Sequence, residues 1–272
     1  MSLATTTALS SVGRMINLPL GTDALNATFR TAPPFPHLVL DNLFQSEILE
    51  RLLEEMEGLR EDQWRLVENR ALERVRRMRS VEELGDAGTE LVNLLHSASF
   101  LHLISRMTGI EHLLPDPYLQ GAGYASMHPG DFFDVHTDRS VAYDTGLTRR
   151  LALIIFLNKA WSADYHGQLE LWDAKATRCE VSIEPVFNRT VIFEVATPNF
   201  HGVPVPVACP VGRSRNSFIV YYHTVGAGGK DVIAHSSIFA QVLYRKRPKL
   251  LTLARQVTPP VLFNAAKKLI GR

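Results

Sequence analysis

The sequence contains little cysteine and no long apolar run. Only Cys179 and Cys209 occur, which is too few for a disulfide framework and favours a reducing compartment, although a single bridge would be compatible. No stretch approaches the roughly 18 consecutive apolar residues that a membrane-spanning helix needs. The first residues also lack a basic start followed by an apolar segment, so we expect no secretory signal. These absences predict a cytoplasmic protein without a transmembrane segment.

The sequence has almost no net charge, yet its C-terminal end lacks acidic residues. A net charge of +1 gives no reason to expect nucleic acid as a partner. Beyond Asp231 no acidic residue follows, and we expect a basic helical segment over 229–272. Such a segment is typical of a solvated helix on the same domain, and the alternative is peripheral contact with a membrane or an acidic partner. Its basic residues are Arg245, Lys246, Arg247, Lys249, Arg255, Lys267, Lys268 and Arg272.

The N-terminal part of the chain has a mainly helical pattern. Residues 1–33 are rich in Thr, Ser and Ala without a clear period, which indicates a loose extension. A short strand and turn are expected over 34–44, and Ser46 can cap a helix whose apolar face runs from Ile48 to Leu59. The charged range 61–80 indicates a mobile loop or a solvated helix. Further helices are expected over 81–97 and 98–108, the second closing at Gly109.

From about residue 115 the pattern changes to short β-rich runs between turn signals. This spacing favours a sandwich or barrel over alternating βαβ units. The expected domain therefore covers 34–228, with helical support over 34–114 and a β-core over 115–228, an α+β arrangement. The strand-like runs cover 151–158, 167–173, 179–185, 189–195 and 216–224.

Three residues from two β-rich regions are candidate metal ligands. His136 and Asp138 are two positions apart, so on a strand both side chains would project to one face. This pair alone is weak evidence in a chain with 10 histidines. His201, after a distant strand-like run, completes two imidazoles and one carboxylate, the facial triad of non-haem Fe(II) oxygenases. Zinc hydrolases use similar ligands, so the triad alone leaves the metal open.

A candidate site for a keto acid lies further along the chain. Arg215 and Ser217 open a predicted strand and share one of its faces. A keto acid that chelates iron at one end presents its distal carboxylate to the protein, and arginine offers a rigid bidentate partner for it. Arg213 competes for this role, but its loop position favours a solvated side chain. We therefore predict that Arg215 and Ser217 bind the co-substrate, which favours an oxygenase over a zinc hydrolase.

The order of these motifs resembles the prolyl-4-hydroxylase-like branch of the Fe(II)- and 2-oxoglutarate-dependent dioxygenases. The motifs are His136-x-Asp138, RRLALIIFLNKAW, GQLELWD, FNRTVIF, HGVPVPV and RSRNS, and they lie within residues 115–225. The resemblance implies a double-stranded β-helix (jelly roll) with helical support. It implies Fe(II), 2-oxoglutarate and O₂ as cofactor and co-substrates, with succinate, CO₂ and a hydroxylated product, and activity supported by ascorbate. It assigns the metal to His136, Asp138 and His201, and the co-substrate to Arg215.

Two positions depart from the family pattern. Phe156 stands where some members have a co-substrate tyrosine, and Met127 occupies another position that is often tyrosine. Tyr124 is the nearest upstream candidate for the missing hydroxyl, so it is expected to bind the co-substrate. By contrast, Asp138 keeps the carboxylate that family halogenases replace with a small residue. The resemblance therefore implies hydroxylation rather than halogenation.

The substrate itself is not specified by any motif. Nothing in the expected lid loops, 61–80 and 139–148, indicates a substrate. We expect a small molecule or biosynthetic intermediate, because the sequence shows no extended acidic or aromatic peptide groove. Hydroxylation of a peptidyl proline is the alternative. A second class of function is a module that binds metal and 2-oxoglutarate without turnover, and a third is the zinc hydrolase. The sequence gives no indication of an oligomeric state.

Overall fold

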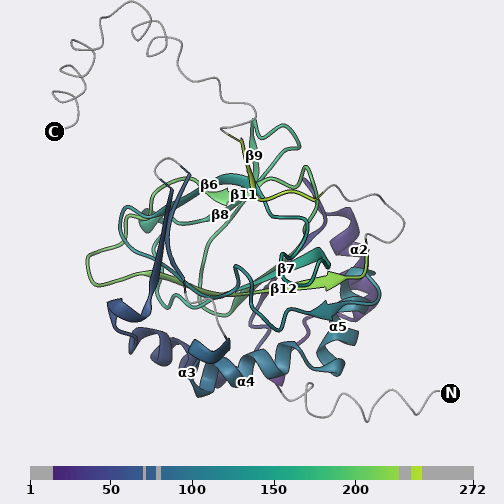
Figure 1. Ribbon diagram of the computed structural model, residues 1–272, viewed down its shortest axis with the longest axis horizontal. Coiled ribbons are helices and arrows are strands. Elements are labelled where there is room, and N and C mark those ends of the chain that lie inside the picture. The colour runs from purple at the N-terminus through teal and green to yellow at the C-terminus, as the bar shows by residue number, and fades with distance from the viewer. Residues whose placement is uncertain (1–14, 70–71, 78–80, 227–233, 241–272) are drawn as a thin grey trace, which may run out of the picture.

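The computed structural model describes residues 15–69, 72–77, 81–226 and 234–240. The helices gather on one side of a β-structure (Figure 1). They are α2 (Thr22–Thr31), α3 (Ser46–Glu57), α4 (Asp86–Leu95) and α5 (Ala98–Thr108), with 3-10 turns at Glu61–Gln63, Val81–Glu83 and Ala163–Tyr165. The first strands are β1 (His37–Asp41), β2 (Arg65–Asn69), β3 (Glu73–Arg77), β4 (Leu114–Pro115), β5 (Gly123–Met127) and β6 (Phe132–Thr137). The others are β7 (Thr148–Phe156), β8 (Leu169–Trp172), β9 (Cys179–Ile183), β10 (Arg189–Glu194), β11 (His201–Val203), β12 (Arg215–Thr224) and β13 (Ile238–Phe239).

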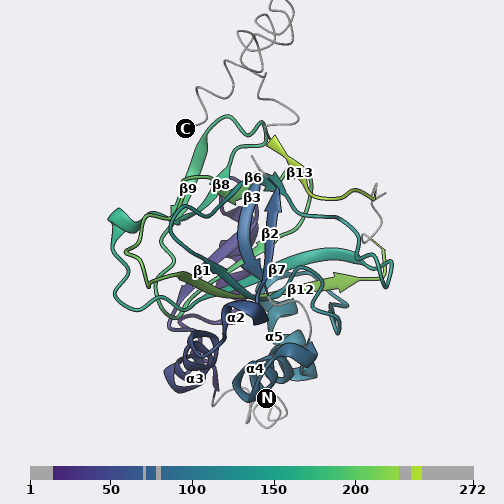
Figure 2. The ribbon, with the colours of Figure 1, turned by 60° about the vertical axis from the view of Figure 1, so that its left-hand side comes forward.

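The strands form two antiparallel layers joined through one bridging strand. One layer has the order β1-β10-β7-β12-β5 and the other the order β6-β11-β8-β9. Strand β3 pairs with both β5 and β6, so it connects the layers (Figure 2). The short strands β4, β2 and β13 add to β12, β3 and β6. This is the expected jelly-roll core with helical support, so the α+β fold class is confirmed.

Strand β7 lies at the centre of the larger layer and explains the longest apolar run of the sequence. It pairs with β10 on one side and β12 on the other. Helices cover one face of this layer and the second layer covers the other, so eight of its nine residues are buried. A strand covered on both faces loses the polar alternation of a half-exposed strand. The buried run therefore indicated a strand, and the prediction over 151–158 is confirmed.

The supporting helices begin and end close to the predicted positions, with two corrections. Ser97 caps α5 by accepting a hydrogen bond from the Phe100 amide at 3.2 Å, and Gly109 ends that helix with φ 73°. However, Gln45 rather than Ser46 precedes α3, and no side chain caps it. The predicted loose extension over 1–33 is wrong for α2, because Leu25 and Phe29 anchor this helix in the core. Residues 1–14 lie outside the described part.

The charged range 61–80 forms a hairpin rather than a loop or a helix. Strands β2 and β3 pair so that Val67 lies opposite Val75, while most of β2 is exposed. Exposure on both faces removes the apolar alternation by which a strand is recognised, which explains the wrong prediction. Strands β1, β2 and β3 thus lie within 34–114, the range that was expected to supply helical support. Residues 70–71 and 78–80 lie outside the described ranges.

The predicted basic helical segment over 229–272 is described only at 234–240. There the chain contributes β13, whose Phe239 lies opposite His136 of β6. The ranges 229–233 and 241–272, with every basic residue named above, fall outside the described residues. Within the described residues, none of the helices is both long and apolar enough to span a bilayer. Cys179 and Cys209 are both free thiols, so the structure contains no bridge between them.

Replacing Leu52 with alanine tests the packing of α3 on the sheet. Leu52 is completely buried, and its loss should lower the free energy of unfolding by about 2–5 kcal/mol, because the cavity is not refilled. Val225→Ala is the control, since this side chain is 82% exposed and should change stability by about 0.5 kcal/mol or less. Urea unfolding followed by circular dichroism measures both. Equal effects of the two substitutions would contradict the packing described here.

Candidate metal centre

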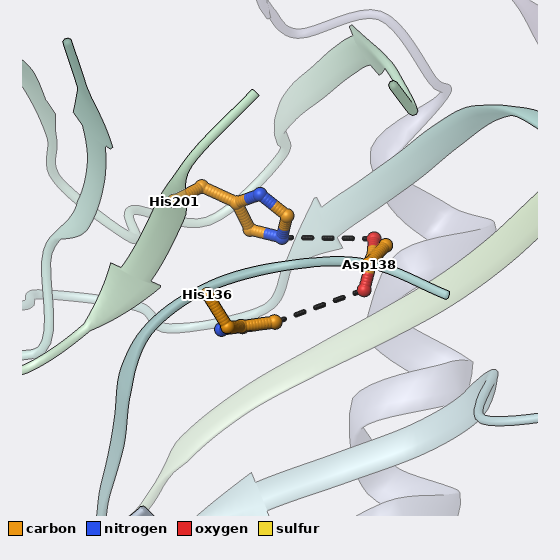
Figure 3. A group of neighbouring side chains, drawn as sticks. All are labelled: His136, Asp138 and His201. Carbon is orange, nitrogen blue, oxygen red and sulfur yellow. Dashed lines mark ion pairs between the residues drawn. The ribbon is translucent and has the colours of Figure 1, made fainter. Parts of the chain in front are cut away.

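Three buried side chains converge between β6 and β11. His201 lies directly opposite His136 in the antiparallel pairing, and Asp138 follows one residue after β6 ends (Figure 3). Asp138 is therefore not on the strand, yet its Oδ1 lies 3.7 Å from His136 Nε2 and its Oδ2 lies 3.6 Å from His201 Nε2. One ligand atom from each residue lies within 4.8 Å of the others. The fold thus brings together the three residues predicted as ligands.

Backbone carbonyls determine which nitrogen of each imidazole faces the cluster. His136 Nδ1 lies 2.8 Å from the Asp134 carbonyl oxygen, and His201 Nδ1 lies 3.2 Å from the Asn199 carbonyl oxygen. A carbonyl only accepts hydrogen bonds, so each Nδ1 carries the proton and donates it. In the neutral ring Nε2 then presents a lone pair, which is the arrangement seen in metal-bound histidines.

The electrostatics of the cluster suit a divalent cation. Burial lowers the pKa of His201 to about 4, so this ring is neutral near pH 7. Burial alone would raise the pKa of Asp138, but nearby positive charge, from His201 and His136 when they are protonated and from Arg149, holds it well below its usual range. Asp138 Oδ2 is buried without a hydrogen-bond donor among the described residues. A carboxylate that faces two imidazole lone pairs away from water needs a positive charge between them, and a metal ion supplies it.

Arg215 occupies the other end of the same cavity as a buried cation. Its Nε donates to the Gly167 carbonyl at 2.5 Å, and its guanidinium lies 4.9 Å from the centre of the Phe156 ring. No carboxylate of the described chain lies within 4.0 Å of it, and burial lowers its pKa to about 9, which leaves it charged near pH 7. A Cβ on Gly167 would approach Arg215 Cδ to 2.9 Å, so only glycine leaves room here.

A small cavity joins Arg215 to the histidines and the aspartate. Ser217 lines it on the same face of β12 as Arg215, as predicted. Much of the remaining wall is apolar, with Ile154, Leu169, Phe193 and Val203. Arg213 lies outside this cavity and donates to the Lys159 carbonyl at 2.6 Å. The cavity therefore brings a buried guanidinium and the cluster of two histidines and one aspartate into one enclosed space.

The prediction for Tyr124 is wrong. Ala125 and Met127 of β5 line the cavity, and Tyr124 projects from the opposite face of this strand. Its hydroxyl donates to Glu55 of α3, in the helical layer. The hydroxyl at the centre belongs instead to Tyr221, which donates to Asp138 Oδ1 at 3.4 Å. Tyr221 lies four and six positions after Ser217 and Arg215, so the two-residue period of the strand could have indicated it.

Residues 120–223 match the family model described as the 2OG-Fe(II) oxygenase superfamily. Over this range the chain resembles 2OG-Fe(II) oxygenases. The predicted family is therefore confirmed, and with it Fe(II), 2-oxoglutarate and O₂ as the reagents that this superfamily uses. The matched range contains His136, Asp138, His201 and Arg215.

Several known proteins resemble this 2OG-Fe(II) oxygenase. The prolyl 3-hydroxylase OGFOD1 of Mus musculus is 26% identical over 178 residues, which are 62% of this chain and 30% of that protein. The chain thus matches less than a third of the length of this curated relative. A prolyl-4-hydroxylase of Pseudomonas putida superposes with a TM-score of 0.57 at 18% identity, covering 76% of this chain and 100% of that one. A prolyl hydroxylase of Trichoplax adhaerens, in complex with a peptide fragment of hypoxia inducible factor, gives 0.54 at 19% identity, covering 74% and 88%. These structures share the fold.

Gly202→Ala should weaken metal binding in this oxygenase, because it forces β11 away from β6. A Cβ at Gly202 would lie 2.9 Å from the Phe133 carbonyl oxygen, and backbone cannot move aside as a side chain can. We expect about a 10- to 100-fold loss of Mn(II) affinity, as for other changes that misplace a ligand. Water-proton relaxation measures it, and Gly21→Ala, which faces open space, is the control. Unchanged affinity in Gly202→Ala would contradict the described strand pairing.

The metal-free protein should lose stability as the pH falls from about 6.5 to about 4. Burial lowers the pKa of His201 to about 4, and burial together with the charge of Arg149 lowers the pKa of His223 to about 4. The unfolded chain binds these protons first, since free histidine titrates near pH 6.5. Urea midpoints across this range should depend less on pH in His201→Gln, whereas replacing the exposed His112 should leave the dependence unchanged. A midpoint independent of pH would refute the assignment.

Proposed function

We propose that this protein is an Fe(II)- and 2-oxoglutarate-dependent dioxygenase that hydroxylates an unactivated C–H bond. The observation that carries the proposal is the shared cavity, with a metal-ligand cluster at one end and an unpaired buried arginine at the other. A zinc hydrolase needs no buried arginine in the same cavity as its metal. In this proposal one molecule of 2-oxoglutarate binds the metal at one end and the Arg215 guanidinium at the other, so the ligand cluster and the arginine both have a partner.

Each residue of the centre has a distinct task in this proposal. His136, Asp138 and His201 hold the metal, and the carbonyls of Asp134 and Asn199 keep the two imidazoles oriented. Arg215 and Ser217 bind the distal carboxylate of 2-oxoglutarate, while the apolar wall excludes water from it. Tyr221 orients the carboxylate of Asp138 through its hydroxyl. Bound iron supplies the activation of O₂ that hydroxylation requires.

The substrate would enter a second hollow that borders the same metal centre. A cleft of about 500 Å³ is lined by Asp138, Phe133 and Tyr221, which also line the inner cavity. This volume suits a small molecule or biosynthetic intermediate. A prolyl residue is the second candidate substrate, favoured by the prolyl 3-hydroxylase that resembles this chain. Comparing hydroxylation of a prolyl peptide with that of free metabolites separates the two.

Arg215→Ala should weaken 2-oxoglutarate binding about 10- to 100-fold while leaving Fe(II) binding unchanged, because a charge-assisted double hydrogen bond is lost. Anaerobic titration of the Fe(II)-loaded protein with 2-oxoglutarate reports the complex through its weak visible charge-transfer band. Arg213→Ala is the matched control, since Arg213 lies outside the cavity. Absence of the band in the wild type, or its persistence in Arg215→Ala at equal concentrations, would overturn the proposal.

Turnover separates an enzyme from a module that only binds metal and 2-oxoglutarate. The wild type with Fe(II), O₂ and 2-oxoglutarate should form succinate slowly even without its substrate, because the co-substrate can be consumed uncoupled from hydroxylation. His136→Ala should abolish this reaction, since it removes an imidazole ligand. Formation of the charge-transfer complex without any succinate would support the sensing module instead.

A further inference from the structure

A second buried arginine lines the larger cleft beside Asp138 and not the inner cavity. Arg149 of β7 is only 5% exposed, and its Nη2 donates to the Gln120 carbonyl at 2.8 Å. Its buried Nε has no hydrogen-bond partner within the described chain. Among the residues that the structure describes, no carboxylate lies within 4.0 Å of its guanidinium. Arg149 is thus a largely buried cation that lacks a direct anionic partner, a costly state for a protein interior.

Arg149 is held against the metal centre but does not line the co-substrate cavity. Its guanidinium lies 3.6 Å from the centre of the Tyr221 ring, and the Tyr221 hydroxyl donates to Asp138. Arg149 lines the larger cleft, together with Asp138, and is absent from the wall of the inner cavity that contains Arg215. The two arginines therefore line different spaces that share Asp138 in their walls.

Arg139 adds a second guanidinium to the same cleft. It follows Asp138 directly and lies 3.4 Å from the centre of the Tyr143 ring, half-buried. The cleft also contains Asp144, which accepts a hydrogen bond from the Gln120 side chain, and Glu73 of β3. Neither forms an ion pair within 4.0 Å with Arg139 or Arg149 in the described ranges. Both guanidiniums thus keep hydrogen-bonding capacity on the substrate side of the centre.

We propose that the substrate carries an anionic group, a carboxylate or a phosphate, that Arg149 and Arg139 bind beside the metal. This inference rests on the proposed function, and it names the class of substrate. A guanidinium binds such groups through two parallel hydrogen bonds, and a rigid stacked arginine loses little side-chain freedom on binding. The incoming anion would offset the cost of burying Arg149 and would anchor the substrate while its reacting carbon faces the metal.

The experiment measures binding of small probes to the full chain, loaded with Mn(II) and N-oxalylglycine. N-oxalylglycine binds the metal and Arg215 in the inner cavity, so the probe anions can bind only in the cleft. The probes are phenyl phosphate, benzoate and neutral benzamide, and paramagnetic line broadening of their NMR signals reports binding near the metal. We expect saturable broadening by phenyl phosphate or benzoate, and at least about tenfold weaker binding of benzamide. The stronger of the two anions distinguishes a phosphate from a carboxylate substrate.

Variants connect this binding to the two arginines. Arg149→Gln and Arg139→Gln should each weaken anion binding about tenfold or more in protein that is still loaded with Mn(II). Arg150→Gln should bind like the wild type, because Arg150 projects from the other face of β7 and lies 3.8 Å from Glu194. If Arg149→Gln does not fold, anion binding by Arg139→Gln tests the inference, because Arg139 is only half-buried. Benzamide binding as tightly as the anions, no broadening by either anion, or wild-type binding in the folded variants would overturn the inference.

Failure of the proposed function would be seen separately. Mn(II) loading is measured by water-proton relaxation before any probe is added, and its absence would refute the metal centre rather than the anion site. Probe binding is then measured by saturation-transfer NMR, which needs no metal. If Mn(II) does not bind but the anions still bind in an arginine-dependent way, the anion site stands as a binding site of its own. If neither Mn(II) nor the anions bind, this inference is overturned as well.

Discussion

The antiparallel pairing of β11 with β6 is the constraint on which the centre depends. It sets His201 opposite His136, and the backbone two residues before each histidine turns the Nε2 lone pairs towards Asp138. This leaves two lone pairs and a carboxylate together away from water, with the pKa of Asp138 held low and the pKa of His201 lowered by burial. Such a cluster is unfavourable on its own, and a divalent cation makes it favourable.

The surrounding fold gives this cluster two different sides. Strand β12 presents Arg215, Ser217 and Tyr221 on one face, so the inner cavity and the ligand Asp138 are connected through a single strand. Strand β7 places Arg149 against Tyr221 on the cleft side. Tyr221 therefore lines both spaces, packs against Arg149 and hydrogen-bonds to the aspartate. The same ring links the co-substrate side to the substrate side of the proposed enzyme.

The parts of the fold that the sequence predicted well are those covered on both faces. Strand β7 and its neighbours are long apolar runs because helices and a second layer enclose them, and such runs are conspicuous. The β2–β3 hairpin was missed because most of β2 is exposed, so this strand has no apolar alternation. Helix α2 was missed because only Leu25 and Phe29 of its 10 residues are buried, too few to establish a period.

In the candidate site too, features that depend on a short local motif were predicted from the sequence, and features that depend on how the strands pair were not. The spacing of His136 and Asp138 and the position of Arg215 were visible in the sequence, because each motif is short and chemically specific. Tyr124 was assigned wrongly because the face of a strand depends on its pairing, and a shift of one residue moves a side chain into the opposite layer. Arg149 was not recognised as a buried residue. Nothing in RRLALIIF distinguishes it from the adjacent Arg150, which forms an ion pair with Glu194.

X-ray absorption at the iron edge tests the central claim most directly, because it counts the ligands of the bound metal by type. The Fe(II)-loaded protein should show two imidazoles and oxygen ligands that include one carboxylate, and His201→Ala should show one imidazole fewer. A sulfur ligand from Cys209, or fewer than two imidazoles in the unmodified protein, would contradict the assignment of His136, Asp138 and His201 as the metal centre.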